Sequence, residues 1–255
     1  MSALTPEDRM TIAAARLLRD RAVVFVGIGL PSKACNLARA THAPGLVLIY
    51  EAGPIGAKPS VLPLSIGDGE LATTADTVVS TPEIFRYWLQ GGRIDVGFLS
   101  AAQIDRFANL NTTVIGPYEK PTVRLPGAGG APEIAAQAGE VFLVLAQSPR
   151  TFVSKLDVVT TVGFGAGGND RQRLGFTGWG PTAVVTELGI LRPDPETREL
   201  VLTELHPGVS RDQAIAATGW PLRVAANVKP TDDPTDAELS ALRSIEARTA
   251  RRLNP

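Results

Sequence analysis

One carboxylate and two glycine-rich loops are the features of this sequence that could do chemistry. Glu51 directly follows the apolar run 46–50, and Gly53 and Gly56 leave space beside it. If that run is a strand of a parallel sheet, Glu51 stands at its carboxyl end, the edge at which such sheets bind ligands. The competing interpretation is an exposed loop acid without a chemical role, which is common for an isolated glutamate.

The first glycine-rich loop is GIGLP at 27–31, between a strand-like run and a helix-like run. Gly27 and Gly29 let a ligand approach the backbone, and the N-terminus of the following helix favours an anion. The loop is not the full dinucleotide fingerprint, because the third glycine of that motif falls on Ser32. A tight turn between strand and helix explains the loop equally well.

The second loop, LPGAGGAPEI at 125–134, contains three glycines that leave backbone N–H groups bare. Bare N–H groups can stabilise an oxyanion, and a simple glycine-rich turn is an equal alternative. In the polar segment 100–113, Gln103 and Asn109 could touch a ligand, although such side chains more often cap turns.

Metal and thiol chemistry find little support in the sequence. His42 and His206 are far apart, and no nucleophile or ligand set pairs with them. The single cysteine, Cys35, lies among apolar residues of a predicted helix, which favours packing over reactivity and excludes an internal disulfide. We therefore expect no metal site.

The elements that must position these residues follow a strand–helix–strand pattern. The run AVVFV at 22–26 is apolar and β-branched, which is typical of a strand buried on both faces. The segment 31–40 is predicted to be a helix, and 46–50 to be the next buried strand. This order predicts a parallel βαβ unit in which the two strands are adjacent and Glu51 lies at their carboxyl edge.

The rest of the chain extends the same architecture. Further strands are expected at 140–146 and 156–163, a hairpin at 182–208, and a charged amphipathic helix at 235–253 that follows a turn-rich linker. We predict a single domain over 1–255 with an α/β fold: a Rossmann-like, mostly parallel sheet flanked by helices, with an antiparallel extension.

Bulk properties exclude several classes of protein. The formal net charge is −1, so no broad basic field favours nucleic acid or an anionic membrane. No stretch reaches the roughly 20 apolar residues of a membrane span, and the first residues lack the apolar region of a signal peptide. We expect a cytoplasmic protein that binds neither nucleic acid nor membrane.

Together and in this order, these features resemble the B subunit of class I coenzyme A transferases, most closely the glutaconate type. The resemblance covers about residues 20–220, almost the whole chain. Each motif is modest alone, but the ordered set is specific. The motifs are VGIGLP (26–31), YEAG (50–53), SAAQID (100–105), NLNTTVIG (109–116), PTVRLPGAGGAPEIA (121–135), KLDVVTT (155–161), VVTELGIL (184–191) and HPGVS (206–210).

The resemblance implies that Glu51 is a nucleophile that carries CoA as a glutamyl-CoA thioester. A carboxylate is a weak nucleophile in water because its solvation must be stripped, and small neighbours permit that desolvation. The residues expected to form the oxyanion hole or to bind CoA are Gly129, Gly130, Ala131, Gly27 and Gly29. The candidates for substrate contact are Gly53, Gln103 and Asn109.

The resemblance also implies the substrates and the assembly. Coenzyme A enters as an acyl-CoA substrate, without a metal, and leaves on a second carboxylic acid, a dicarboxylate or a 3-oxo acid. A separate A subunit of related fold completes the active site in a heterodimer or heterotetramer. One position differs from the usual motif: Ala52 stands where the family commonly has a serine or an asparagine, so any side-chain hydrogen bond there is lost.

Two other functions fit the same sequence. Some proteins of this fold decarboxylate or hydrolyse acyl-CoA esters without transferring CoA. A non-catalytic, ligand-binding protein of Rossmann-like topology is the third alternative, in which Glu51 has only a structural role.

Overall fold

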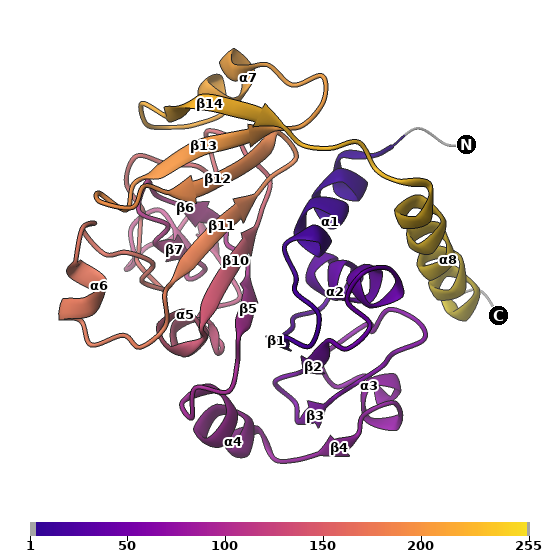
Figure 1. Cartoon of the computed structure of the whole chain (residues 1–255). Coiled ribbons are helices and arrows are strands. Elements are labelled where there is room, and N and C mark those ends of the chain that lie inside the picture. Colours follow the sequence, from indigo (N-terminus) through magenta and orange to yellow (C-terminus); the bar gives the residue numbers. More distant parts are fainter. Residues whose placement is uncertain (1–3, 254–255) are drawn as a thin grey trace. The chain divides into compact units, whose positions relative to one another are not determined.

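A computed structural model describes residues 4–253 of the chain (Figure 1). The chain separates into two compact units, one formed by residues 1–98 together with 233–255 and the other by residues 99–232. Each unit combines strands with helices, and the predicted α/β class is confirmed. That both units form a single domain stays a prediction.

The first unit is built on three parallel strands. β1 (Val23–Phe25) lies between β2 (Val47–Ile49) and β5 (Val96–Leu99) and runs parallel to both. Beyond β2, the short strands β3 (Pro54–Ile55) and β4 (Thr77–Val78) continue the sheet in antiparallel pairs. The predicted adjacency of the first two strands is therefore confirmed.

The helix α2 (Leu30–Ala40) connects β1 to β2 and completes the predicted βαβ unit. The residue before it, Gly29, has a φ of 73°, a left-handed conformation that favours glycine. Pro31 occupies the first turn, where its missing N–H costs nothing. The chain therefore turns sharply from the carboxyl end of β1 into α2.

Two helices from opposite ends of the chain lie beside α2 (Figure 1). Arg16 on α1 (Pro6–Arg16) forms a two-pronged ion pair with Glu238 on α8 (Asp236–Leu253), with both N···O distances at 2.7 Å. Arg243 of α8 pairs with the buried Asp8 of α1 at 2.9 Å. The predicted C-terminal helix is thus present and is held against the start of the chain.

The remaining elements of this unit are short. α3 begins after an aspartate cap, and a single turn of α-helix runs directly into a π-helix. These elements are α3 (Gly69–Thr73), α4 (Thr81–Glu83) and the π-helix Ile84–Leu89.

The second unit is built on five strands in the order β14-β13-β12-β11-β10. The two outer pairs are parallel and the two inner pairs are antiparallel, which is the predicted antiparallel extension. The strands are β10 (Glu140–Val144), β11 (Pro181–Val185), β12 (Gly189–Pro193), β13 (Leu200–Leu205) and β14 (Arg223–Pro230). The smaller elements are β6 (Gln103–Ile104), β7 (Leu110–Asn111), β8 (Val114–Ile115), β9 (Val123–Arg124), α5 (Ala131–Gln137), α6 (Asp170–Arg173) and α7 (Arg211–Ala216).

The strand predicted at 156–163 is wrong. The amides of Thr160 and Thr161 both donate to the carbonyl of Leu110, at 2.9 and 3.1 Å. Two consecutive donors cannot point to one acceptor in an extended strand, whose amides alternate in direction. The segment is therefore bent, and it contributes only an isolated bridge between Leu110 and Thr161.

The hairpin predicted at 182–208 contains three strands instead of two. The Thr186 hydroxyl oxygen accepts hydrogen bonds from the amides of Leu188 and Gly189, both at 3.1 Å. These bonds turn the chain back after β11, so β11, β12 and β13 form a meander. The strand β14 lies in the stretch that was expected to be a linker.

Among residues 4–253, no helix combines the length and the apolar character needed to cross a bilayer.

Candidate active site

Glu51 lies at the tip of the tight turn that joins β2 to β3. The Gly53 amide donates to the Tyr50 carbonyl at 3.0 Å, and the Tyr50 amide donates to the Pro54 carbonyl at 3.0 Å. These bonds close the turn, so Glu51 and Ala52 project from the carboxyl end of β2. The placement of the acid at this edge agrees with the sequence prediction.

The Glu51 carboxylate is available for chemistry. Its side chain is half-exposed, and it has no hydrogen-bond or ion-pair partner among the described residues of the first unit. A carboxylate that accepts no hydrogen bond retains its full electron density on both oxygens, which favours nucleophilic attack once water is displaced.

The first glycine loop reaches the same edge as Glu51. β1 and β2 are parallel and in register, with Phe25 opposite Ile49, and the Val26 amide donates to the Ile49 carbonyl at 2.9 Å. A Cβ atom added at Gly27 or Gly29 would meet no atom within 4 Å. The space above this loop is therefore open, as a binding role for it requires.

Gly53 lies in close contact with a neighbouring backbone segment. The sequence predicts free space beside it, but a Cβ atom there would overlap the backbone carbonyl oxygen of Val79. The φ of Gly53 is 120°, and the Val79 amide donates to the Gly53 carbonyl at 3.1 Å. Glycine is needed here because the turn touches the neighbouring backbone. Contact between Gly53 and substrate stays a prediction.

A buried hydrogen bond that the sequence did not predict ties the Glu51 turn to the start of α2. The Tyr50 hydroxyl and the Ser32 hydroxyl are 3.0 Å apart, and both side chains are fully buried. Burial raises the pKa of the Tyr50 phenol, while the Ser32 hydrogen bond acts in the opposite direction. The phenol therefore stays protonated and fixes the residue that precedes Glu51.

We expect Tyr50→Phe to lower the free energy of unfolding by about 1 kcal/mol, the usual net value of one hydrogen bond. The variant keeps the ring and removes only the hydroxyl, leaving the Ser32 hydroxyl with the distant Asn36 amide at 3.5 Å. Chemical denaturation measures the loss. We also expect kcat to fall by less than about 10-fold, because the turn keeps its two backbone hydrogen bonds.

Tyr87→Phe is the matched control for this substitution. Tyr87 is 59% exposed, and its hydroxyl has no hydrogen-bond partner among the described residues of the first unit. Equal stability losses for the two variants would contradict a special role for the Tyr50–Ser32 bond.

The second glycine loop leads into α5 and offers two unused amides. The Gly127 amide donates to the Thr112 carbonyl at 2.8 Å, and the Ala131 amide to the Ala128 carbonyl at 3.1 Å. The amides of Gly129 and Gly130 donate to no acceptor among residues 99–232. These two N–H groups are therefore better candidates for an oxyanion hole than that of Ala131. Their action on the substrate of Glu51 stays a prediction.

Gln103 and Asn109 hold their own loops. The Gln103 amide donates to Asp157 at 2.8 Å and its oxygen accepts from Asn111 at 2.7 Å. The Asn109 amide donates to Asp105 and to the Gly165 carbonyl, at 2.8 and 2.9 Å. Both ends of each amide have partners, which favours a structural role. A contact with substrate stays a prediction for both.

The thiol and the imidazoles lie in structural surroundings. Cys35 is fully buried in α2, and burial raises the pKa of its thiol, so the reactive thiolate is disfavoured. His206 is buried between the Thr231 hydroxyl and the Thr186 carbonyl, each at 2.9 Å. His42 is exposed and contacts Thr41 and the Leu18 carbonyl.

Known families and curated proteins match this sequence along most of its length. A family profile described as Coenzyme A transferase matches residues 7–217. The chain is 66% identical over 98% of its length to the B subunit of the 3-oxoadipate CoA-transferase of Pseudomonas knackmussii, of which it covers 96%. It is 31% identical over 94% of its length to the B subunit of the glutaconate CoA-transferase of Acidaminococcus fermentans, of which it covers 91%.

Solved structures show the same fold. The glutaconate coenzyme A-transferase of Acidaminococcus fermentans superimposes with a TM-score of 0.88 at 30% identity, over 94% of this chain and 93% of that one. The decarboxylase AibA/AibB superimposes with a TM-score of 0.83 at 25% identity, over 98% of each chain. The fold is thus shared by proteins named for two different reactions.

Proposed function

Because this chain belongs to the coenzyme A transferase family, we propose that it is the B subunit of a two-subunit enzyme that moves CoA between 3-oxoadipate and a second carboxylic acid. The observation that carries the chemistry is the half-exposed Glu51 carboxylate at the carboxyl edge of β1 and β2, which has no partner among the described residues of its unit. An acyl-CoA supplies the CoA, and a separate A subunit is the protein partner.

The choice of 3-oxoadipate is supported by the 66% identity to a protein named for that substrate, against 31% to one named for glutaconate. 3-Oxoadipate is at once a dicarboxylate and a 3-oxo acid, the two substrate classes expected from the sequence. The resemblance to the glutaconate type thus predicted the transfer of CoA. The identity to the 3-oxoadipate enzyme supports 3-oxoadipate as one of the two acids.

The reaction proceeds through two covalent states of Glu51. A carboxylate oxygen attacks the thioester carbonyl, and the C–S bond breaks. CoA departs as a thiolate, and a mixed anhydride remains on Glu51. The thiolate then attacks the glutamyl carbonyl, the anhydride C–O bond breaks, and the first acid departs as a carboxylate. The acceptor carboxylate reverses both steps on the glutamyl-CoA thioester. No net proton is consumed, so the site needs no acid–base residue for the balance.

Each attack creates a negatively charged oxygen that must be stabilised. Backbone N–H groups held at the position of that oxygen are the usual solution, and losing one typically costs on the order of 10²–10³ in rate. The amides of Gly129 and Gly130 suit this task because neither donates within its own unit. Gly27 and Gly29 leave the loop beside Glu51 open for the CoA chain.

The test uses the chain co-purified with its A subunit. When 3-oxoadipyl-CoA is incubated with a second dicarboxylate, we expect free 3-oxoadipate and the new acyl-CoA in equal amounts. Liquid chromatography measures both products. Thioester consumption should stop when the acceptor acid is omitted, and the chain without its A subunit should be inactive.

The same assay separates the alternatives. Steady loss of thioester without an acceptor, with free CoA as the product, would indicate hydrolysis. Release of carbon dioxide with the thioester intact would indicate the decarboxylation for which AibA/AibB is named. Either result would overturn the proposal of CoA transfer.

A further inference from the structure

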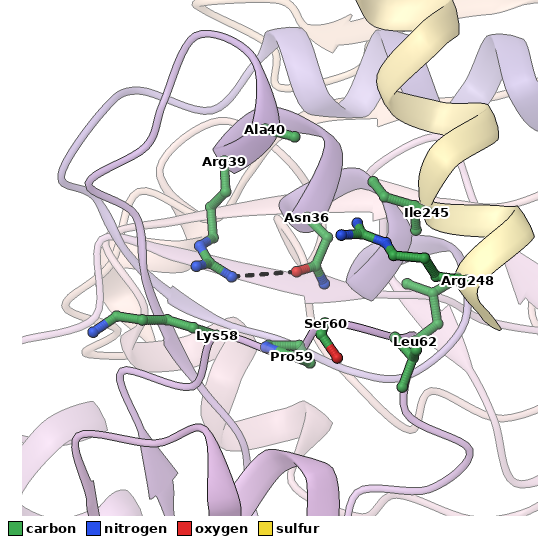
Figure 2. Close-up of a pocket in the computed structure, with 10 residues that line it drawn as sticks. Asn36, Arg39, Ala40, Lys58, Pro59, Ser60, Leu62, Ile245 and Arg248 are labelled. Carbon is green, nitrogen blue, oxygen red and sulfur yellow. Dashed lines mark hydrogen bonds between the residues drawn. The ribbon is translucent and has the colours of Figure 1, made fainter. Parts of the chain in front are cut away.

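A pocket of about 320 Å³ lies in the first unit between α2, the segment 58–62 and α8 (Figure 2). Its charged lining residues are all basic, namely Arg39, Lys58 and Arg248, and Asn36 and Ser60 add neutral polar groups. Its apolar lining comes from residues such as Pro59, Leu62 and Ile245, so the pocket combines positive charge with an apolar wall.

This pocket lies at the opposite edge of the sheet from Glu51. Arg39 is on the last turn of α2, the helix that returns the chain from the carboxyl end of β1 to the start of β2. β3 runs antiparallel to β2 and carries the chain away from the Glu51 turn, and the Ala57 amide then donates to the Leu48 carbonyl at 3.2 Å. The pocket residues that follow thus lie toward the amino ends of β1 and β2, so the pocket is not part of the proposed active site.

Of these three cations, only Lys58 forms an ion pair with a described residue of the first unit. The Lys58 ammonium pairs with Asp76 at 2.6 Å, and Figure 2 shows it pointing away from Asn36. Arg248 has no ion pair or hydrogen bond among the described residues of the first unit. Arg39 has no acidic partner among the same residues. In Figure 2 the guanidinium groups of Arg39 and Arg248 lie on either side of the Asn36 amide.

The hydrogen-bonding capacity of the Arg39 guanidinium is only partly used. Its Nε atom is buried and makes no hydrogen bond within the described part of the chain, while one terminal nitrogen donates to the Asn36 side-chain oxygen at 3.3 Å. Burial lowers the pKa of Arg39 because the charged form is partly desolvated. Because the buried Nε is shielded from the pocket, the terminal nitrogens of Arg39 are the donors that an anion there would reach, and pairing with an anion would also offset the desolvation of the guanidinium.

We propose that this pocket binds a small organic anion whose carboxylate or phosphate head group is held by Arg39 and Arg248, with its short apolar body against Leu62 and Ile245. Guanidinium groups bind both kinds of head group through paired N–H donors. The pocket has room for more than a bare ion, and its apolar wall gives the rest of such a molecule a place to lie.

Isothermal titration of the full chain with inorganic phosphate and, separately, with butyrate tests the proposal, with sodium chloride at equal ionic strength as the baseline. We expect saturable binding of at least one of the two probes. Tighter binding of phosphate identifies a phosphate head group, and tighter binding of butyrate a carboxylate. Absence of saturable binding of both probes would overturn the proposal.

Arg248→Gln locates the binding. This side chain is exposed, so the substitution is compatible with folding, and loss of one charged donor should weaken binding by about 10-fold or more. Arg251→Gln is the matched control, because it removes the same charge from the same helix at a residue that does not line the pocket. Equal affinities in these two variants would contradict the site.

Arg39→Lys independently tests the role of the Arg39 guanidinium. It keeps the positive charge but removes the planar set of N–H groups, so binding should weaken by about 10-fold although the charge is unchanged. A thermal melt confirms that this variant folds, and an unaltered affinity would contradict the role of Arg39.

Discussion

Glu51→Gln is expected to lower kcat for CoA transfer by at least about 10³-fold, because the amide cannot form the anhydride or the thioester. The carboxylate is half-exposed and has no partner among residues 4–98 and 233–253, so the change should leave the free energy of unfolding within about 0.5 kcal/mol of the parent. Steady-state rates of the assembled enzyme and chemical denaturation measure the two quantities.

Shortening the side chain separates position from charge. Glu51→Asp keeps a carboxylate but retracts it by about 1 Å, and a misplacement of that size can cost on the order of 10² in rate. Glu196→Gln is the matched control, since Glu196 is an exposed acid in the turn between β12 and β13 and should not affect kcat.

The covalent state itself can be trapped. Incubation of the assembled enzyme with acyl-CoA and borohydride should reduce the glutamyl thioester of the parent and leave a mass change on the peptide that contains Glu51. The Glu51→Gln variant should show no such change. A glutamine variant as fast as the parent, with no deamidation by mass spectrometry, would mean that the covalent mechanism is wrong for this protein.

The first half of the fold was predictable because its signals are local. The apolar runs 22–26 and 46–50 are long enough to be buried on both faces. Gly29 and Pro31, which lie between them, mark the start of a helix. This pattern fixed the parallel pairing of β1 and β2, and with it the edge on which Glu51 stands. The sequence overestimated the lengths of both strands and did not indicate the short elements β3 and α3.

The missed strand shows where local signals fail. β14 (Arg223–Pro230) is half-exposed or exposed along its length, and its valines and alanines do not alternate regularly with polar residues. It is a strand because its backbone pairs with β13, a partner about 20 residues earlier in the chain. Tertiary pairing overrides local preference in such edge strands, and no pattern within the segment indicates it.

For the candidate site, the sequence indicated the residue types and the sheet edge, but not the contacts that hold them. Glycine and glutamate positions could be read from the sequence, but the reason for a glycine could not. Gly27 leaves open space, whereas Gly53 touches the backbone of Val79, and only the structure separates these two roles. The Tyr50–Ser32 bond joins residues 18 positions apart, and neither has a pattern that marks it as polar and buried.

Gly53→Ala should damage both stability and activity because of this close backbone contact. An alanine at a φ of 120° is strained, and its Cβ would overlap the Val79 carbonyl oxygen, so the turn must move. We expect a loss of about 3 kcal/mol in the free energy of unfolding, from roughly equal contributions of strain and overlap. A displacement of Glu51 by about 1 Å should also lower kcat on the order of 10²-fold.

Gly27→Ala is the control that makes this prediction specific. Gly27 lies on the neighbouring loop, its φ is not in the left-handed region, and an added Cβ would meet nothing within 4 Å. Its free energy of unfolding should therefore stay within about 1 kcal/mol of the parent. Denaturation curves of both variants test the stability, and kcat of the assembled Gly53→Ala enzyme tests the activity. If Gly53→Ala proved as stable as Gly27→Ala, then the turn would have freedom to move, and the rigid placement of Glu51 by β2, β3 and Val79 could not be the basis of its reactivity.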